Sequence, residues 1–112
     1  MRIPIRKPGK YKNVKVGGYD SKRERKRAME LKVLRMAGDI QCLREQVKYE
    51  LIPSQRGADG KVIERAVSYI ADFVYERGGK VIVEDAKGMK TPVYIVKRKM
   101  MLFFHGIRVV EV

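Results

Sequence analysis

The sequence is poor in the residues that most often build disulfides, zinc sites and histidine-centred active sites. Its 112 residues include one cysteine, Cys42, one histidine, His105, and no tryptophan. A single cysteine excludes an internal disulfide and a cysteine-rich zinc site. One histidine argues against metal sites and catalytic triads that depend on imidazole groups. Enzyme classes built on these groups are therefore not expected.

Long hydrophobic runs are also missing. No apolar stretch approaches the roughly 20 residues that a membrane-spanning helix needs. The first twelve residues, MRIPIRKPGKYK, are basic but lack the apolar segment of a secretory signal. We therefore expect no membrane partner and a cytoplasmic location. The length of 112 residues is enough for one domain with one modest hydrophobic core.

Acidic residues are outnumbered two to one. Against 13 Asp and Glu stand 26 Lys and Arg, which gives a formal charge of +13. A chain with this balance is attracted to polyanions, to nucleic acid first and to anionic membrane surfaces second. The charge indicates a class of partner and says nothing of the chemistry.

Residues 1–20 are rich in proline, glycine and lysine and predict a basic arm ahead of one domain over 21–112. Tyrosines alternate with lysines in this arm, which suits contact with phosphates and bases. The expected nucleic-acid contacts of the arm are Lys10, Lys12 and Lys15. For residues 1–10 a solvated tail is an equally good interpretation.

A helix is expected to begin at Ser21 and to end near Ala37. Ser21 and Glu24 form a capping box, and Gly38 is a suitable residue just past the end. Glu24 lies on the apolar face of this helix, so it is either only a cap or a side chain directed towards a site on the sheet. Cations at a helix start oppose the macrodipole, which favours a role in phosphate binding. These cations are Lys22, Arg23, Arg25 and Lys26.

The rest of the chain predicts three strands of a sheet, a second helix and a last strand. In order, we expect a strand over 46–52, a loop over 53–62, a strand over 63–76, a glycine turn at 78–79, a strand over 80–87, a helix over 91–104 and a strand over 107–112. The second helix starts at Thr91-Pro92. Its expected core face consists of Val93, Val96, Met100 and Phe103. The order α-β-β-β-α-β predicts an α/β fold with a mixed sheet.

Two acids and a lysine interrupt the apolar strands on either side of the glycine turn. Side chains alternate along a strand, so Asp85 and Lys87 share one face, and a hairpin brings Asp72 beside them. Unpaired carboxylates on apolar strands are costly, and Mg²⁺ is one reason to keep them. Two alternatives stay open: a plain salt bridge at the strand edge, and Glu84 as the acid in place of Asp85.

These features resemble the PD-(D/E)XK nuclease superfamily, which includes restriction endonucleases and Holliday-junction resolvases. The resemblance rests on the element order, on an acid in the first helix and the second strand, and on Asp85-Ala86-Lys87 in the third. More narrowly, a family of small phage and prophage proteins is similar in four segments: KYKNVKVGGYDSKRE, LKVLRMAGDIQCLREQVKYELIP, YIADFVY and VEDAKG. The proline that often precedes the first acid is replaced by Ala71.

The resemblance implies a restriction-endonuclease-like fold and a Mg²⁺-dependent (or Mn²⁺-dependent) DNA endonuclease, phage-encoded and active in the host cytoplasm. On this resemblance Asp72 and Asp85 would ligate the metal, the Ala86 carbonyl is a candidate third ligand, and Glu24 would bind a second metal or a metal-bound water. Lys87 would position the attacking water. Gln46 matches a glutamine often found on the family's first core strand and is an expected contact to nucleic acid.

The family also implies how DNA is bound. The arm and the starts of both helices, with Lys97 and Lys99 on the second, would contact phosphates. Small resolvases of the superfamily are homodimers that cut branched DNA during recombination. The alternatives are a nicking or repair endonuclease and a non-catalytic nucleic-acid-binding protein, which cleavage assays with Mg²⁺ and with EDTA would separate.

Overall fold

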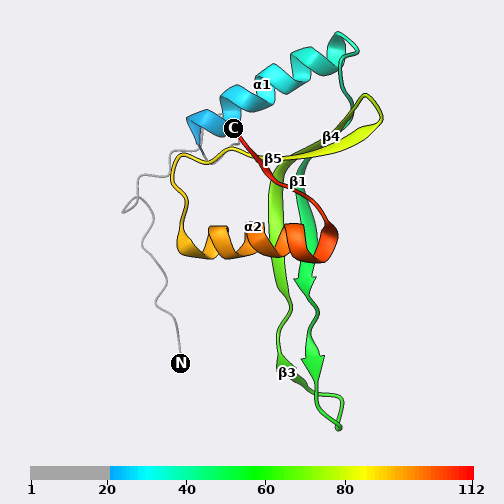
Figure 1. The fold of residues 1–112 in the computed structure, drawn as a ribbon, viewed down its shortest axis with the longest axis vertical. Helices are drawn as coiled ribbons and strands as arrows, with labels where there is room; N and C mark the ends of the chain where they lie inside the picture. The colour runs from blue at the N-terminus through cyan, green and yellow to red at the C-terminus, as the bar shows by residue number, and fades with distance from the viewer. Residues whose placement is uncertain (1–20) are drawn as a thin grey trace.

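A computed structural model describes residues 21–112 and contains two helices and two β-sheets (Figure 1). The elements are α1 (Lys22–Met36), β1 (Gln41–Ile52), β2 (Gln55–Arg56), β3 (Val62–Glu64), β4 (Val67–Arg77), β5 (Lys80–Asp85), α2 (Pro92–His105) and β6 (Val110–Glu111). Within this range, neither helix has the length and apolar character needed to cross a bilayer.

The main sheet is mixed and has the strand order β1-β4-β5-β6. Neighbours β1, β4 and β5 are antiparallel, whereas β6 runs parallel to β5. A parallel neighbour needs a crossover, and α2 provides it between β5 and β6. The fold is therefore α/β with a mixed central sheet flanked by helices, as the sequence predicts.

The two helices cover opposite faces of this sheet. Phe73 and Tyr75 of β4 pack with Ala28 and Leu31 of α1, whereas the intervening residue Val74 packs with α2. Successive side chains of a strand point to opposite faces, so one strand can supply both cores. The sheet is consequently buried on both sides at its centre, where β4 and β5 meet.

Both predicted helix starts are confirmed by their caps. The Ser21 hydroxyl accepts a hydrogen bond from the Glu24 amide at 3.0 Å, and the Thr91 hydroxyl accepts one from the Tyr94 amide at 3.1 Å. Each bond satisfies an amide that the first turn would leave without a partner. The glycine turn is confirmed too, because Gly78 and Gly79 both have positive φ.

The stretch between β1 and β4 is a hairpin where a loop was expected. Strands β2 and β3 pair as a separate sheet that extends away from the body of the molecule (Figure 1). The expected strand over 63–76 is therefore interrupted between β3 and β4. The later strands are also shorter than expected, because β5 ends at Asp85 and β6 spans only Val110–Glu111.

The predicted core face of α2 is wrong for three of its four residues, and only Met100 packs against the core. Val93, Val96 and Phe103 have exposed fractions of 64%, 50% and 83%, whereas the buried residues of the helix are Tyr94 and Met101. The Tyr94 hydroxyl donates to Glu111 of β6 at 2.8 Å, and this polar contact fixes which side of α2 faces the sheet. Periodicity could not locate that side because α2 is apolar over most of its circumference.

Candidate functional site: an acidic cluster beside a basic helix start

Two adjacent acids at the end of β5 are both buried and face opposite sides of the sheet. Glu84 and Asp85 have exposed fractions of 1% and 2%. Glu84 faces α1, where Arg27 donates to both of its carboxylate oxygens at 2.8 and 2.7 Å and the Tyr75 hydroxyl also donates. A buried carboxylate with a bidentate arginine is fully paired. Glu84 therefore has no free oxygen to offer a ligand.

Asp85 faces the other side of the sheet and is only half paired. Its Oδ2 accepts a 2.5 Å hydrogen bond from the Tyr69 hydroxyl. Its Oδ1 lies 3.5 Å from the Lys87 ammonium but accepts no hydrogen bond from any of residues 21–112. A buried polar atom without a partner is rare in native proteins and calls for an explanation. Of the two candidate acids, Asp85 is therefore the one with a carboxylate oxygen, Oδ1, that can bind a ligand.

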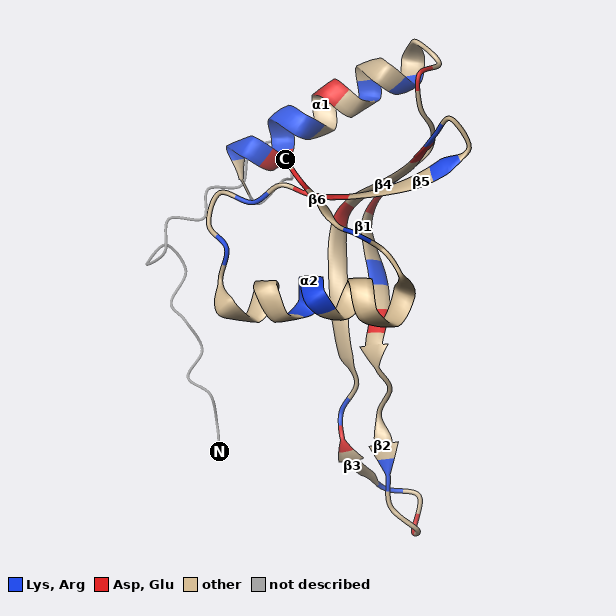
Figure 2. Cartoon of the chain, viewed as in Figure 1, with Lys and Arg blue, Asp and Glu red and all other residues tan. Residues whose placement is uncertain are grey.

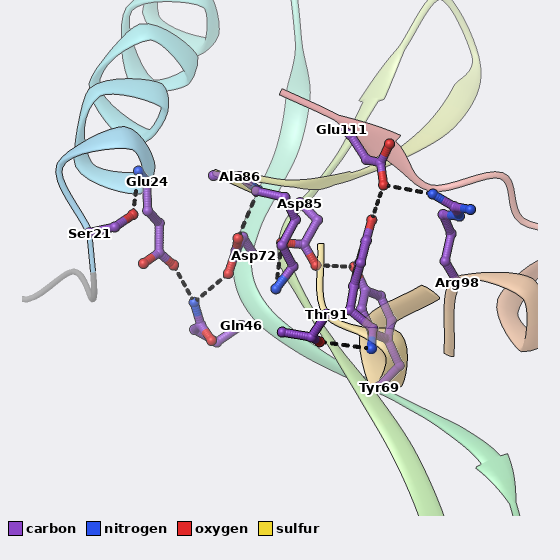
Figure 3. Close-up of polar contacts among 12 residues, drawn as sticks. Ser21, Glu24, Gln46, Tyr69, Asp72, Asp85, Ala86, Thr91, Arg98 and Glu111 are labelled. Carbon is purple, nitrogen blue, oxygen red and sulfur yellow. Dashed lines mark hydrogen bonds and ion pairs between the residues drawn. The ribbon is translucent and has the colours of Figure 1, made fainter. Parts of the chain in front are cut away.

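Asp72 lies against Asp85 across the β4–β5 hairpin, as the strand alternation predicts. Phe73 pairs with Glu84 in the antiparallel register, so the next position along brings Asp72 opposite Asp85. The Ala86 amide donates to Asp72 Oδ2 at 2.9 Å and fixes this carboxylate beside its neighbour (Figure 3). Asp72, Asp85 and Lys87 are thus brought together.

Glu24 and Gln46 extend the cluster towards the start of α1. The Gln46 side-chain amide donates to Glu24 Oε1 at 2.7 Å and lies 3.4 Å from Asp72 Oδ1, which bridges the two acids (Figure 3). Glu24 is buried, with 4% exposed. Gln46 has φ 54°, a left-handed conformation that costs free energy for a residue other than glycine. Strained backbone of this kind tends to concentrate at functional sites.

The crowding of carboxylates changes their acidity. The pKa of Asp85 is raised to about 6, and burial is the largest cause; the Tyr69 hydrogen bond opposes the shift, and the neighbouring Asp72 carboxyl adds to it. Burial also raises the pKa of Asp72. Both shifts have the sign expected where carboxyl groups are buried away from water without enough positive charge beside them to balance their own charge.

A divalent metal ion fits this imbalance. Mg²⁺ needs one or two carboxylates, with waters and phosphate oxygens completing its shell. Asp72 and Asp85 supply the two carboxylates, and Asp85 Oδ1 supplies an oxygen that is otherwise unsatisfied. Over residues 21–112 no group of three or more acidic, histidine or cysteine side chains is placed so that it could hold a metal ion. An ion held by the two carboxylates would take the rest of its shell from waters and phosphate oxygens.

Basic residues gather on the first turns of α1, next to this cluster (Figure 2). Lys22, Arg23, Arg25 and Lys26 are exposed on the first turns, around the buried Glu24. The loop after Asp85 lies close by, because a β-carbon added to Gly88 would come within 3.8 Å of Arg23 Nε. On α2, Lys97 is half-buried and Lys99 is exposed. The arm lysines Lys10, Lys12 and Lys15 lie outside the described residues.

Sequence reasoning missed Tyr69 as a member of the site. Its hydroxyl is the hydrogen-bond donor that orients Asp85, and contact with that acid, after burial, helps to raise the pKa of Tyr69. A tyrosine three residues before Asp72 on an apolar strand was the available signal, since a buried tyrosine hydroxyl requires a partner.

A family model described as "Protein of unknown function (DUF1064)" matches residues 8–109. The match covers most of the chain, which therefore belongs to this family. No curated protein and no solved structure matches the chain.

Proposed function

We propose that this DUF1064 protein is a Mg²⁺-dependent DNA endonuclease of the restriction-endonuclease-like kind. One observation supports the proposal above the others: Asp85 Oδ1 is buried against Asp72 and Lys87, and no hydrogen-bond donor among residues 21–112 reaches it. A salt bridge alone would leave this oxygen unsatisfied, whereas a metal ion would satisfy it. The high positive charge of the chain supports DNA as the substrate.

Asp72 and Asp85 would hold the ion, Mg²⁺ or Mn²⁺, and the Ala86 carbonyl is the proposed third ligand. When bound, the ion supplies Lewis-acid polarisation of the phosphate and a more acidic bound water. The Ala86 amide and the Tyr69 hydroxyl keep the two carboxylates oriented through hydrogen bonds of 2.9 and 2.5 Å. The protein thus positions its ligands before a substrate arrives.

Lys87 is the proposed catalytic cation. Its ammonium lies 3.5 Å from Asp85 Oδ1 and 4.7 Å from the centre of the Tyr94 ring. An ammonium fixed between a carboxylate and an aromatic face can orient a water and stabilise negative charge that develops on a phosphate. This position holds the positive charge of Lys87 beside Asp85, the proposed metal ligand.

Glu24 is proposed to act through a second ion or a bound water and not only as part of a helix cap. It is buried and linked through the Gln46 amide to Asp72, which a capping role does not require. Glu24→Gln separates the two roles because glutamine can still accept the Gln46 hydrogen bond. We expect Glu24→Gln to lose cleavage activity by at least about 100-fold with an unchanged melting temperature. Near wild-type activity would mean that Glu24 serves only as part of the helix cap.

The enzyme assay uses labelled junction, flap, duplex and single-stranded DNA with Mg²⁺, with Mn²⁺ and with EDTA. We expect metal-dependent cleavage by the wild type, and a loss of at least about 100-fold in Asp85→Asn and in Lys87→Ala. Asp85→Asn should bind DNA as well as or better than the wild type, because a negative charge near phosphate is removed. Binding without cleavage on every substrate would contradict the endonuclease proposal and favour a non-catalytic binding protein.

DNA contact by the start of α1 can be tested through salt. Each phosphate neutralised on duplex DNA contributes about 0.9 to the slope of log K against log salt. Replacing Lys22 and Lys26 by alanine should reduce the slope by about 1 to 2, on that relation. Arg35→Ala, at the other end of the same helix, is the matched control and should leave the slope unchanged.

We also infer a homodimer, with contact through the C-terminal patch of α2, which we define as Leu102, Phe103 and Phe104. These consecutive residues have exposed fractions of 55%, 83% and 51%, which is unusual for a monomer surface. A second copy would also bring a second acidic cluster for a second DNA strand. Light scattering should show Phe103→Glu as a monomer, with Met36→Glu as the control. A monomeric wild type would contradict this assignment.

A further inference from the structure

A groove opens beside the acidic cluster on the side that faces α2. Its volume is about 290 Å³, and Asp85 and Lys87 are among the residues that line it. Strand β4 contributes Ser68 and Ile70 to the lining, and α2 contributes Val93 and Lys97. Thr91, the residue that caps α2, also lines it and lies close to Asp85 and Tyr69 (Figure 3). The groove is therefore continuous with the site of the proposed reaction.

The lining of the groove combines two exposed apolar side chains with two cations. Ile70 and Val93 have exposed fractions of 53% and 64%, although both lie beside well-packed core residues. Lys87 and Lys97 also line it, and Asp85 is the only acid among its lining residues in the described part of the chain. An apolar slot with cations at its edge is complementary to a nucleobase attached to its phosphate backbone.

The size of the groove limits what can enter. A volume of about 290 Å³ lies at the small end of ligand pockets and suits one ring system, not a base pair. Bases inside a continuous duplex are stacked and paired, so a base can enter such a slot only after it leaves the stack. Enzymes that accept an unstacked base place it between aromatic or aliphatic side chains. Ile70 and Val93 are such a pair.

We propose that this groove receives one unstacked nucleotide next to the phosphate that is cut. The inference rests on the endonuclease proposal and adds the class of substrate to it. Leaving the stack costs least for a nucleotide that is already unpaired. The groove therefore selects DNA with an unpaired nucleotide beside the cut, such as a bulge, a flap or a branch point, over continuous duplex.

The experiment follows binding without cleavage, so that it does not depend on catalysis. A set of oligonucleotides carries 2-aminopurine, whose fluorescence rises when it leaves the base stack, at an unpaired position and at a paired one. Binding is measured with the full-length protein in Ca²⁺ and again in EDTA. We expect the wild type to bind the bulged DNA at least tenfold more tightly than the duplex, with a change in fluorescence at the unpaired position.

Val93→Trp fills the groove and should remove both the preference and the fluorescence change. Val33→Trp is a matched control, because Val33 is also a helical valine with 64% exposed and lies on α1, away from the groove. Ile70→Trp tests the opposite wall and should reproduce the effect of Val93→Trp. Melting temperatures of all three variants confirm that each one is folded.

Equal binding of bulged and duplex DNA by the wild type would overturn the groove proposal, as would equal behaviour of Val93→Trp and Val33→Trp. Neither result would contradict the proposed endonuclease activity, which the cleavage assay with Mg²⁺ tests separately. Conversely, a preference that Val93→Trp removes, in a protein that cuts no substrate, would support the groove and reject the enzyme.

Discussion

Glu84 and Asp85 are neighbours on one strand, equally buried, and yet they belong to very different surroundings. On the α1 face, Glu84 has a bidentate arginine and a tyrosine hydroxyl as partners. On the α2 face, Asp85 has one tyrosine, a lysine at 3.5 Å and a second acid beside it. The first arrangement stabilises the fold, whereas the second retains an unsatisfied oxygen. The comparison teaches that burial alone does not distinguish the two acids, whereas the completeness of their pairing does.

The largest expected effect comes from breaking the paired side. Arg27→Met keeps the aliphatic stem but leaves the Glu84 charge buried and without its cation. Removing one partner of a buried ion pair costs about 3–5 kcal/mol, so the free energy of unfolding should fall by about that amount. Urea denaturation measures the loss, and Arg35→Met on the same helix is the control. A change below about 1 kcal/mol would mean that solvent reaches Glu84 easily.

The backbone of Gln46 offers a second test of the unsatisfied side. Glycine tolerates φ 54° without the penalty of about 1–2 kcal/mol that other residues pay, so Gln46→Gly should be more stable than Gln46→Ala by about 1 kcal/mol. Both variants lose the bridging amide, and both should lose cleavage activity equally.

Cys42 is the matched control for this strain, because it also has φ 54° and is exposed. Cys42→Gly should gain stability without any change in cleavage. If Gln46→Gly and Gln46→Ala were equally stable, the left-handed backbone at Gln46 would be unstrained, and strain would no longer distinguish this side of the sheet.

Asp85→Asn should have the opposite sign to Arg27→Met. In metal-free buffer it removes a buried charge that lies against Asp72, so we expect the free energy of unfolding to rise on the order of 1 kcal/mol. Added Mg²⁺ should raise the melting temperature of the wild type, because a ligand that binds only the folded state stabilises it, but not that of the variant. A clear loss of stability in Asp85→Asn would place Asp85 with Glu84 as a structural acid.

The smallest effect is a change in how stability depends on pH. The pKa of Asp85 is raised to about 6 in the folded state, above its ordinary value of about 3.9 when unfolded. The folded state therefore holds the proton more tightly, and this contribution to stability is greatest below pH 4 and is lost as the pH rises to 6. Urea denaturation in EDTA at pH 4.5, 5.5 and 6.5 should show this decline in the wild type. A decline of equal size in Asp85→Asn would assign it to another group.

Several parts of the fold could be predicted because their signals are local. The hydroxyls of Ser21 and Thr91 cap the two helices at the expected positions, and two glycines with positive φ close the hairpin. Strand alternation correctly separated Asp85 from Glu84 and brought Asp72 beside Asp85. Each of these inferences depends on residues that are near one another in the chain or joined by one tight turn.

The sequence predictions failed where a distant contact sets the orientation of a helix, or where strands are too short to show a pattern. The inward face of α2 depends on a hydrogen bond between Tyr94 and Glu111, which lie 17 positions apart. The β2–β3 hairpin forms a sheet of only two short strands, and neither strand is long enough to show an alternating apolar pattern in the sequence. Periodicity cannot locate the inward face of α2 because its partner lies outside the window that is read, and it cannot detect β2 and β3 because these exposed strands are too short to show an apolar alternation.

By itself, the sequence determined the basic character of the protein, the ends of both helices, the hairpin and the sharing of one face by Asp72 and Asp85. Only the tertiary structure decided which buried acid is left with an unsatisfied oxygen. Arg27 reaches Glu84 across 57 positions, and the side chain of Gln46 joins Glu24 to Asp72 from a strained backbone. Pairing of charges depends on distances of a few ångströms between elements, and only the packing of the helices onto the sheet sets those distances.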